Sequence, residues 1–307
     1  MDTTHDFRFG VNLTTTDPTA VQENARSVEA AGFDLLHATD HLGLHDPVAV
    51  LSAAATATAQ VRLGTLVLNN EFWNPALLAR AVGSLDQISG GRFELGLGCG
   101  YMKSEFDSAG IAWRTHADRV AALETTVVEL DRIVADDSRK PTPLQRPRPP
   151  LLIGAHGKAT LELAARHADI VGFSGLTQIP GAAPGTFRIA DSAETSERVE
   201  FVHQRAGPRA MELEFNVLIQ RVEITDDAER TAAGLADGYQ RAGLTSARDV
   251  LDNPFLLVGT AEEIATEILA ARRRYGFTNI VTHWSYRDAL AEAMPLVRRW
   301  AGDGPGT

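Results

Sequence analysis

Residues 63–75 read Leu-Gly-Thr-Leu-Val-Leu-Asn-Asn-Glu-Phe-Trp-Asn-Pro, and residues 89–101 read Ser-Gly-Gly-Arg-Phe-Glu-Leu-Gly-Leu-Gly-Cys-Gly-Tyr. The first stretch predicts a buried strand followed by Asn74-Pro75, a pair typical of a helix N-terminus. The second predicts a glycine turn, another buried strand and a loop of small residues. Together they predict a β-α-β unit of a parallel sheet, with an opening of about phosphate size at its end.

The same alternation extends in both directions along the chain. Asp17-Pro18 and Asp46-Pro47 predict two further helix starts in the N-terminal half. Strands are expected at eight positions, most of them as continuous apolar runs: 8–13, 33–38, 61–68, 92–97, 151–153, 169–174, 213–224 and 279–284.

Eight strands with intervening helices predict an α/β fold, a (β/α)8 TIM barrel with insertion loops, as a single domain over residues 1–307. The rival is a doubly wound open sheet. That fold has fewer strands and often carries a dinucleotide fingerprint after the first one, which is absent here. The proline-rich segment 140–150 is too short to separate independent domains.

Composition limits the classes of function. A net charge of −11 and a pI near 5.3 argue against nucleic-acid binding. The single cysteine, Cys99, excludes an internal disulfide and a cysteine-rich metal site, and the histidine spacing predicts no metal site. Residues 1–6 are polar and acidic, unlike a signal peptide, and no apolar run is long enough to span a membrane. We therefore expect a cytoplasmic protein.

Candidate catalytic residues follow the second expected strand. Asp40 can accept hydrogen bonds from a polar ring, and His41 can transfer a proton near neutral pH. Active sites of α/β barrels lie at such strand ends. The alternative is a histidine that caps a helix or bonds the backbone. Four other titratable residues are expected to face solvent or cap helices: Glu105, Asp107, His116 and Asp118.

Two glycine-containing loops are candidates for ligand binding. Gly98 and Gly100 lie past a strand, where bare backbone lets a ligand approach closely, although packing in a crowded barrel also explains glycines. The segment Gly154-Ala155-His156-Gly157 lies between a strand and a helix. It predicts a phosphate site at the helix N-terminus, and the alternative is a tight turn.

At these residues the chain resembles the bacterial luciferase-like oxidoreductases, over nearly its whole length. The resemblance is carried by the segments Phe9–Asn12, Ala30–Asp34, Thr39–His41, Arg62–Thr65, Asn74–Ala79, Leu85–Arg92, Leu95–Gly98, Pro150–Gly154 and Ala164–Asp169. Members of that family are eight-stranded α/β barrels. Some use reduced FMN and oxygen, and others use coenzyme F420, a deazaflavin that carries hydride. The form of Thr39-Asp40-His41 is similar to the F420 branch.

The resemblance implies roles for individual residues. A cis peptide bulge near Leu66 and Val67 would back the deazaflavin ring, and Asn69 would lie beside its polar edge. Asp40 would contact the cofactor, and His41 would assist proton movement. Further lining residues would be Cys99, Gly100 and Ser104, and Gly154, Ala155, His156 and Gly157 would hold the phosphate.

Position 101 departs from the family's sugar-phosphate dehydrogenases. Those enzymes carry a glutamate after the glycine that corresponds to Gly100, whereas this chain has Tyr101. Sugar-phosphate oxidation is therefore doubtful. Tyr101 is a candidate proton donor, and an aromatic lid is an equal alternative.

We therefore expect an F420-dependent oxidoreductase acting on a small organic substrate, with hydride leaving the reduced cofactor as the favoured direction. The alternatives are an FMN-dependent monooxygenase and a non-catalytic flavin- or deazaflavin-binding barrel. The loop 175–193, rich in glycine, alanine and proline, is expected to cover the substrate pocket. Because family members often form dimers, a homodimer is expected.

Overall fold

The computed structural model describes residues 5–14 and 17–302. Residues 1–4, on which the expected lack of a signal peptide partly rests, lie outside that part. The described chain forms a closed barrel of parallel strands, which confirms the predicted fold. In order around the barrel the strands are β1 (Arg8–Leu13), β2 (Leu35–Ala38), β3 (Arg62–Thr65), β5 (Phe93–Gly98), β6 (Leu151–Gly154), β7 (Ile170–Phe173), β10 (Glu214–Ile219) and β13 (Phe277–His283).

Two pairings close the ring. Strand β1 pairs with β13, so Gly10 lies opposite Val281, and β3 pairs with β5. A short continuation of β3, β4 (Leu68–Asn69), pairs with the end of β5. All of these pairings are parallel, so the carboxyl ends of the barrel strands meet at one face.

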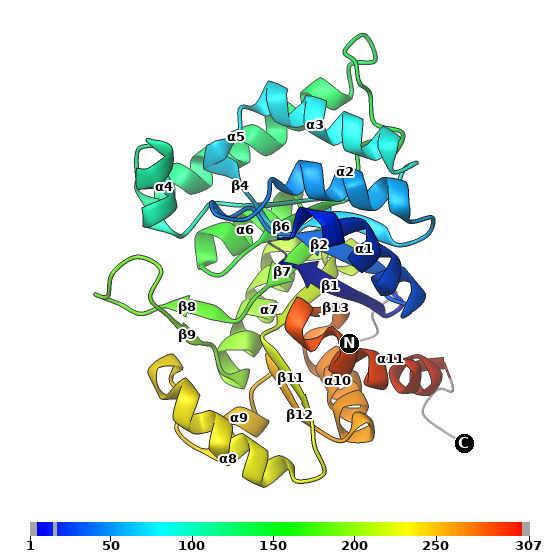
Figure 1. Ribbon diagram of the computed structural model, residues 1–307. Helices are drawn as coiled ribbons and strands as arrows, with labels where there is room; N and C mark the ends of the chain where they lie inside the picture. Colours follow the sequence, from blue (N-terminus) through cyan, green and yellow to red (C-terminus); the bar gives the residue numbers. More distant parts are fainter. Residues whose placement is uncertain (1–4, 15–16, 303–307) are drawn as a thin grey trace.

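Helices surround the barrel, as Figure 1 shows. Their N-termini have the predicted caps where the sequence places Asp or Asn before Pro: Asp46 accepts a hydrogen bond from Ala49, and Asn74 accepts one from Ala76. The surrounding helices are α1 (Val21–Ala30), α2 (Pro47–Ala57), α3 (Pro75–Ile88), α5 (His116–Val134), α6 (Lys158–His167), α7 (Ser192–Ala206), α10 (Ala261–Tyr275) and α11 (Arg287–Gly302).

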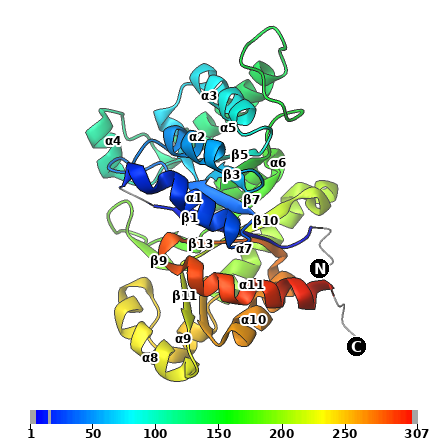
Figure 2. The same cartoon turned by 45° about the vertical axis from the view of Figure 1, so that its right-hand side comes forward.

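Figure 2 brings forward helices from both ends of the chain, α1 and α11. Arg298 of α11 donates to the carbonyl of Gly32, just after α1, and to the carboxylate of Asp34. None of the helices in the described ranges is long and apolar enough to cross a membrane.

The expected strand 213–224 is wrong as a single element. The chain leaves the barrel at Gln220, whose amide donates to the carbonyl of Phe255. The second half becomes β11 (Arg221–Ile224), paired with an unpredicted strand, β12 (Leu256–Gly259). Two helices, α8 (Ala228–Tyr239) and α9 (Ala247–Leu251), lie between them. Apolar residues lie on both sides of Gln220 and Arg221, so the sequence pattern did not mark the break.

Two other segments near the open face carry more structure than expected. The loop 175–193 contains an antiparallel hairpin of β8 (Leu176–Gln178) and β9 (Phe187–Ile189). A short helix, α4 (Lys103–Ala109), follows β5. In Figure 1 the hairpin projects beyond the barrel.

Four charged residues at the amino ends of the strands form the basal ion cluster. Arg8 donates to Glu94 at 2.6 Å and to Glu214 at 2.9 Å, and Arg62 donates to Glu94 at 2.5 Å. Burial disfavours the charge of Glu94, but Arg8 and Arg62 outweigh it and lower the pKa of this carboxyl. The cluster joins β1, β3, β5 and β10 at the end of the barrel opposite the candidate site.

Candidate active site

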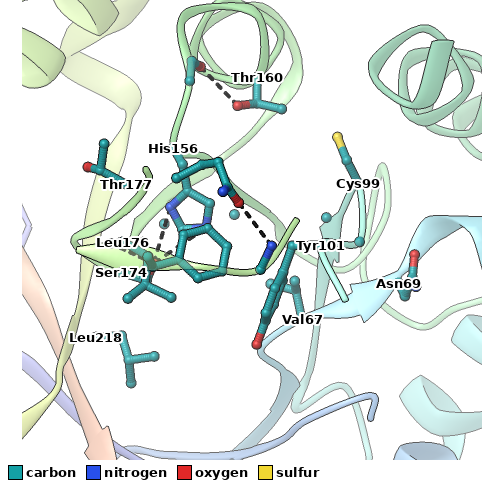
Figure 3. A pocket seen from close by; sticks show the side chains of 18 of the residues that line it. Val67, Asn69, Cys99, Tyr101, His156, Thr160, Ser174, Leu176, Thr177 and Leu218 are labelled. Atoms are coloured by element: carbon teal, nitrogen blue, oxygen red, sulfur yellow. Dashed lines mark hydrogen bonds between the residues drawn. The ribbon is translucent and has the colours of Figure 1, made fainter. Parts of the chain in front are cut away.

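A cavity of about 800 Å³ opens at the carboxyl ends of the barrel strands. Each of the eight strand ends contributes to its lining: Asn12, Asp40, Val67, Gly98, Gly154, Ser174, Leu218 and His283. In Figure 3, His156, Ser174 and Thr177 lie on one side of the view and Asn69 and Cys99 on the other. The site is therefore where a barrel fold places its chemistry.

One wall of the cavity combines the Leu66–Val67 peptide with three glycines. The peptide bond between Leu66 and Val67 is cis, as the resemblance implied. A Cβ at Gly98 would lie 2.7 Å from Val67 Cγ2, and a Cβ at Gly154 would lie 3.3 Å from Val67 Cγ1. At Gly100, where φ is 69°, a Cβ would lie 2.4 Å from Asn69 Oδ1. The absent Cβ atoms leave room for the side chains of Val67 and Asn69, which is the packing explanation for these glycines, and close approach of a ligand stays a prediction.

Asp40 fixes the backbone at the edge of that wall. Its Oδ2 accepts hydrogen bonds from the amide of Asn69 at 3.0 Å and from Trp73 Nε1 at 3.3 Å. Burial raises the pKa of Asp40, while these two hydrogen bonds oppose the shift. Asp40 and Asn69 both line the cavity.

His41 lies between two polar partners. Its Nδ1 is 2.9 Å from Glu105 Oε1, and its Nε2 is 3.3 Å from the hydroxyl of Tyr101. The Tyr101 ring also packs edge-on against Phe187 of the hairpin, with 5.3 Å between ring centroids. Partial burial, and then the charge of Glu105, raise the pKa of Tyr101.

The expectation that Glu105 faces solvent or caps a helix is wrong. The residue is 8% exposed and lines the cavity, because α4 turns it inward against the loop that follows β2. His116, expected at the surface or as a cap, is exposed in the first turn of α5, and it also lines the cavity.

The wall formed by β6, β7 and α7 is polar. Gly157 precedes the first turn of α6 without a side-chain cap, and Thr160 of that turn lines the cavity. His156 lies 3.2 Å from the hydroxyl of Ser174. Burial lowers the pKa of His156 to about 4, and the charge of Arg198 adds to the shift, so the ring is neutral near pH 7.

Two arginines that the sequence reading missed carry positive charge to the site. Arg119 of α5 is 5% exposed, lies 3.9 Å from the ring centroid of Trp113, and donates to the carbonyl of Cys99 at 3.2 Å. Arg198 of α7 donates to the hydroxyl of Thr177 at 2.5 Å. Both line the cavity. Helical periodicity marks neither of them as different from a surface arginine.

Two predicted lining residues lie elsewhere. Ser104 is exposed in the first turn of α4, where the following residue, Glu105, points inward instead. Ala155 is 1% exposed and packs in the core, and its amide donates to the carbonyl of Gly172. The other predicted site residues line the cavity: Asp40, His41, Leu66, Val67, Asn69, Gly98, Cys99, Gly100, Tyr101, Gly154, His156 and Gly157.

The hairpin covers part of the opening. Leu176, Ile179, Pro180 and Phe187 line the cavity from this side, together with uncharged neighbours. Gln178, the long polar side chain here, bonds within the loop, because its amide donates to the carbonyl of Ala183 at 3.0 Å. The hairpin therefore presents a largely apolar surface to the cavity.

Over residues 5–14 and 17–302, no three His, Cys, Asp or Glu side chains are grouped so that they could hold a metal ion. Burial raises the pKa of the Cys99 thiol to about 12, so this residue stays protonated at neutral pH.

The chain is similar to a known protein family and to several known proteins. A family model described as luciferase-like monooxygenase matches residues 3–279. A 5,10-methylenetetrahydromethanopterin reductase from Methanolobus tindarius is 33% identical over 172 residues. That match covers 52% of this chain and 52% of the reductase, so the similarity spans about half of the relative's length.

Two further relatives match over more of the chain. An F420-dependent glucose-6-phosphate dehydrogenase from Nakamurella multipartita is 28% identical over 295 residues, or 86% of this chain and 82% of the relative. An FMNH2-dependent dimethylsulfone monooxygenase from Pseudomonas fluorescens is 25% identical over 285 residues, or 81% of this chain and 77% of the relative. Proteins named for either cofactor are thus similar to this chain.

Among solved structures, an F420-dependent secondary alcohol dehydrogenase in complex with an F420-acetone adduct superposes with a TM-score of 0.74. The match covers 96% of this chain and 100% of that chain at 18% sequence identity. At this identity the likeness shows the shared fold alone.

Proposed function

This chain belongs to the luciferase-like monooxygenase family, and from that membership we propose that it is a coenzyme F420-dependent oxidoreductase. It transfers hydride between the reduced deazaflavin and a small organic substrate, and reduction of the substrate is the favoured direction. The observation that carries the proposal is the placement of His41, with Glu105 and Tyr101, beside a glycine-walled cavity. A hydride donor needs such a proton-transferring partner.

The cavity fits a planar ring with an anionic tail. Val67, Gly98, Gly100 and Gly154 line one side of the cavity, and the three glycines extend no side chain into it, so this side leaves room for a flat ring. Asn69, which lines the same side of the cavity, would be available to the polar edge of such a ring. When bound there, F420 supplies a two-electron hydride carrier without the oxygen chemistry of flavins.

The opposite wall fits a phosphate. The N-terminus of α6 at Gly157 provides backbone N–H groups and the positive end of the helix dipole. Thr160, neutral His156 and Arg198 surround it, and Arg198 brings a full positive charge. We propose that these groups bind the phosphate of the cofactor, which leaves the apolar hairpin to face the substrate.

His41 performs the proton transfer in this proposal. In the reductive direction the substrate carbon receives the hydride electron pair, the π bond to its neighbouring atom breaks, and that atom takes a proton from Nε2 of His41. In the oxidative direction Nε2 accepts the proton instead. The Tyr101 hydroxyl, 3.3 Å from Nε2, is a second group that can transfer a proton. It can donate to this nitrogen or to the substrate.

The second candidate is an FMN-dependent monooxygenase. The similarity to the FMNH2-dependent dimethylsulfone monooxygenase supports it, and so does the hairpin, whose apolar residues line the cavity. The same walls would hold FMN, so cofactor binding decides between the two.

The test is a pair of titrations with F420 and FMN, followed by quenching of tryptophan fluorescence, because Trp113 lines the cavity. The proposal expects micromolar binding of F420 and FMN binding at least about tenfold weaker. His41→Ala is the matched control, because it should keep the F420 affinity while turnover with an accepted substrate falls about 100-fold or more. Tighter FMN binding would instead establish the monooxygenase.

A further inference from the structure

Glu105 lies beside one of the two ring nitrogens of His41. The carboxylate comes from the first turn of α4, and one oxygen atom, Oε1, meets two groups. It accepts a hydrogen bond from the amide of Leu42 at 3.1 Å and lies 2.9 Å from His41 Nδ1. An ionised carboxylate only accepts hydrogen bonds, so Nδ1 must carry a hydrogen.

The second ring nitrogen is then left for chemistry. Because Nδ1 carries the hydrogen in the neutral ring, Nε2 has a lone pair, and it lies 3.3 Å from the Tyr101 hydroxyl. Tyr101 and Glu105 are four residues apart in the segment between β5 and α5. The segment between β5 and α5 therefore supplies the partners of both ring nitrogens of His41, which itself follows β2.

We propose that Glu105 is a positioning residue for His41: it holds the Nδ1–H tautomer, keeps Nε2 directed to the cavity, and compensates the positive charge while the ring is protonated. The consequence for turnover rests on the proposed function. When Nε2 gives its proton to the reduced substrate, the N–H bond breaks and a bond from this hydrogen to the substrate forms. The ring becomes neutral, and its Nδ1–H still donates a hydrogen bond to the Glu105 carboxylate. The oxidative direction reverses each change.

A purely structural role for Glu105 is the competing explanation. In that case the carboxylate would serve only to satisfy the amide of Leu42, and the protonation of the ring would be independent of it. The two explanations differ in what happens to the ring nitrogens when the carboxylate is replaced.

The test uses 15N-histidine-labelled, ligand-free protein and the 15N NMR signals of the His41 ring at a pH where the ring is neutral. The signals are assigned by their absence in His41→Gln. The proposal expects the Nδ1–H tautomer in the parent chain, whereas histidine in water favours Nε2–H. Glu105→Leu should lose the Nδ1–H preference, and Glu105→Gln should restore it, because the amide oxygen still accepts a hydrogen bond. Tyr101→Phe, which leaves Glu105 in place, should keep it.

An Nε2–H tautomer in the parent chain would overturn the proposal without any variant, so it stays falsifiable even if Glu105→Leu fails to fold. An unchanged tautomer in folded Glu105→Leu would overturn it equally. Neither measurement needs F420 or turnover. If F420 fails to bind, the proposed function fails while the tautomer result still decides the role of Glu105.

Kinetics supply a second readout once a substrate is known. Glu105→Leu should lower kcat about 100-fold with little change in the cofactor dissociation constant, and Glu105→Gln should recover part of the loss. In the His41→Ala background the Glu105→Leu substitution should cause no further loss, because its effect passes through the imidazole. Additive losses in this double-mutant cycle would contradict the positioning role.

Discussion

Gly100 is constrained by its own backbone and by its neighbour. Its φ of 69° disfavours any residue with a Cβ, and an added Cβ would lie 2.4 Å from Asn69 Oδ1. Gly110 offers a matched control, because its φ is 68° and no atom lies within 4 Å of the position a Cβ would take. Comparing substitutions at the two glycines therefore separates the effect of backbone strain from the effect of the contact with Asn69.

We predict that Gly100→Ala destabilises the protein by about 2–3 kcal/mol and weakens cofactor binding about tenfold, because Asn69 must move. Gly110→Ala should cost only about 1 kcal/mol and leave binding unchanged. Thermal unfolding and the fluorescence titration measure both quantities. Equal binding losses in the two variants would show that Asn69 does not depend on the bare backbone at position 100.

Which site residues the sequence could predict depends on where they lie in the chain. Asp40 and His41 directly follow an apolar strand, so the pattern alone places them at the open face. Glu105, Arg119 and Arg198 lie on helices, where a polar residue at helical spacing predicts a solvent-facing side chain. Their inward orientation follows from how α4, α5 and α7 pack on the barrel, which one sequence does not encode locally.

At the scale of elements, the β8–β9 hairpin is tied to the polar wall through one side chain. Arg198 of α7 donates to the hydroxyl of Thr177 on β8, and burial lowers the pKa of its guanidinium without removing its charge. The group that we propose for phosphate binding therefore also holds the hairpin.

We predict that Arg198→Met raises the amide hydrogen exchange of residues 176–189 about tenfold and weakens F420 binding by about tenfold or more. Thr177→Val is the control, because it breaks the same hydrogen bond and keeps the charge. It should loosen the hairpin to a similar extent and weaken F420 binding less. If both variants reduce the affinity equally, Arg198 acts through the hairpin and not on the phosphate.

The elements themselves were predictable where local chemistry marks their ends. Asp46-Pro47 and Asn74-Pro75 predicted helix starts that the structure confirms. The break at Gln220 was not predictable, because apolar residues on both sides continue the strand pattern while β11 turns to pair with β12. The pairing partner lies more than thirty residues away, beyond the reach of a local pattern.

At the scale of the whole molecule, a histidine inside the barrel makes stability depend on pH. His37 of β2 is 1% exposed, and within residues 5–14 and 17–302 its Nδ1 has no hydrogen-bond partner. Burial lowers the pKa of His37 to about 4, with Glu94 opposing and Arg8 adding to the shift. Between the unfolded value near 6.5 and this value, the unfolded chain binds more protons than the folded chain.

The free energy of unfolding should therefore fall as the pH is lowered from about 6.5 to 4, and His37 should contribute up to about 1.4 kcal/mol per pH unit. His37→Gln removes this contribution, so its stability should decline less steeply over the same window. Urea unfolding at several pH values measures the slopes. Parallel curves for the two proteins would mean that His37 does not carry the pH dependence.

The way the cavity is built affects how much of the folded protein a cell can maintain. Its lining comes from every strand of the closed barrel, so a chain in which one strand is unpaired has no complete binding site. A ligand in that cavity consequently stabilises only the fully folded protein, and the stabilisation grows with the ligand concentration. The abundance of the protein would then follow the supply of its ligand, and destabilising inherited variants would be tolerated where the ligand is plentiful and degraded where it is scarce.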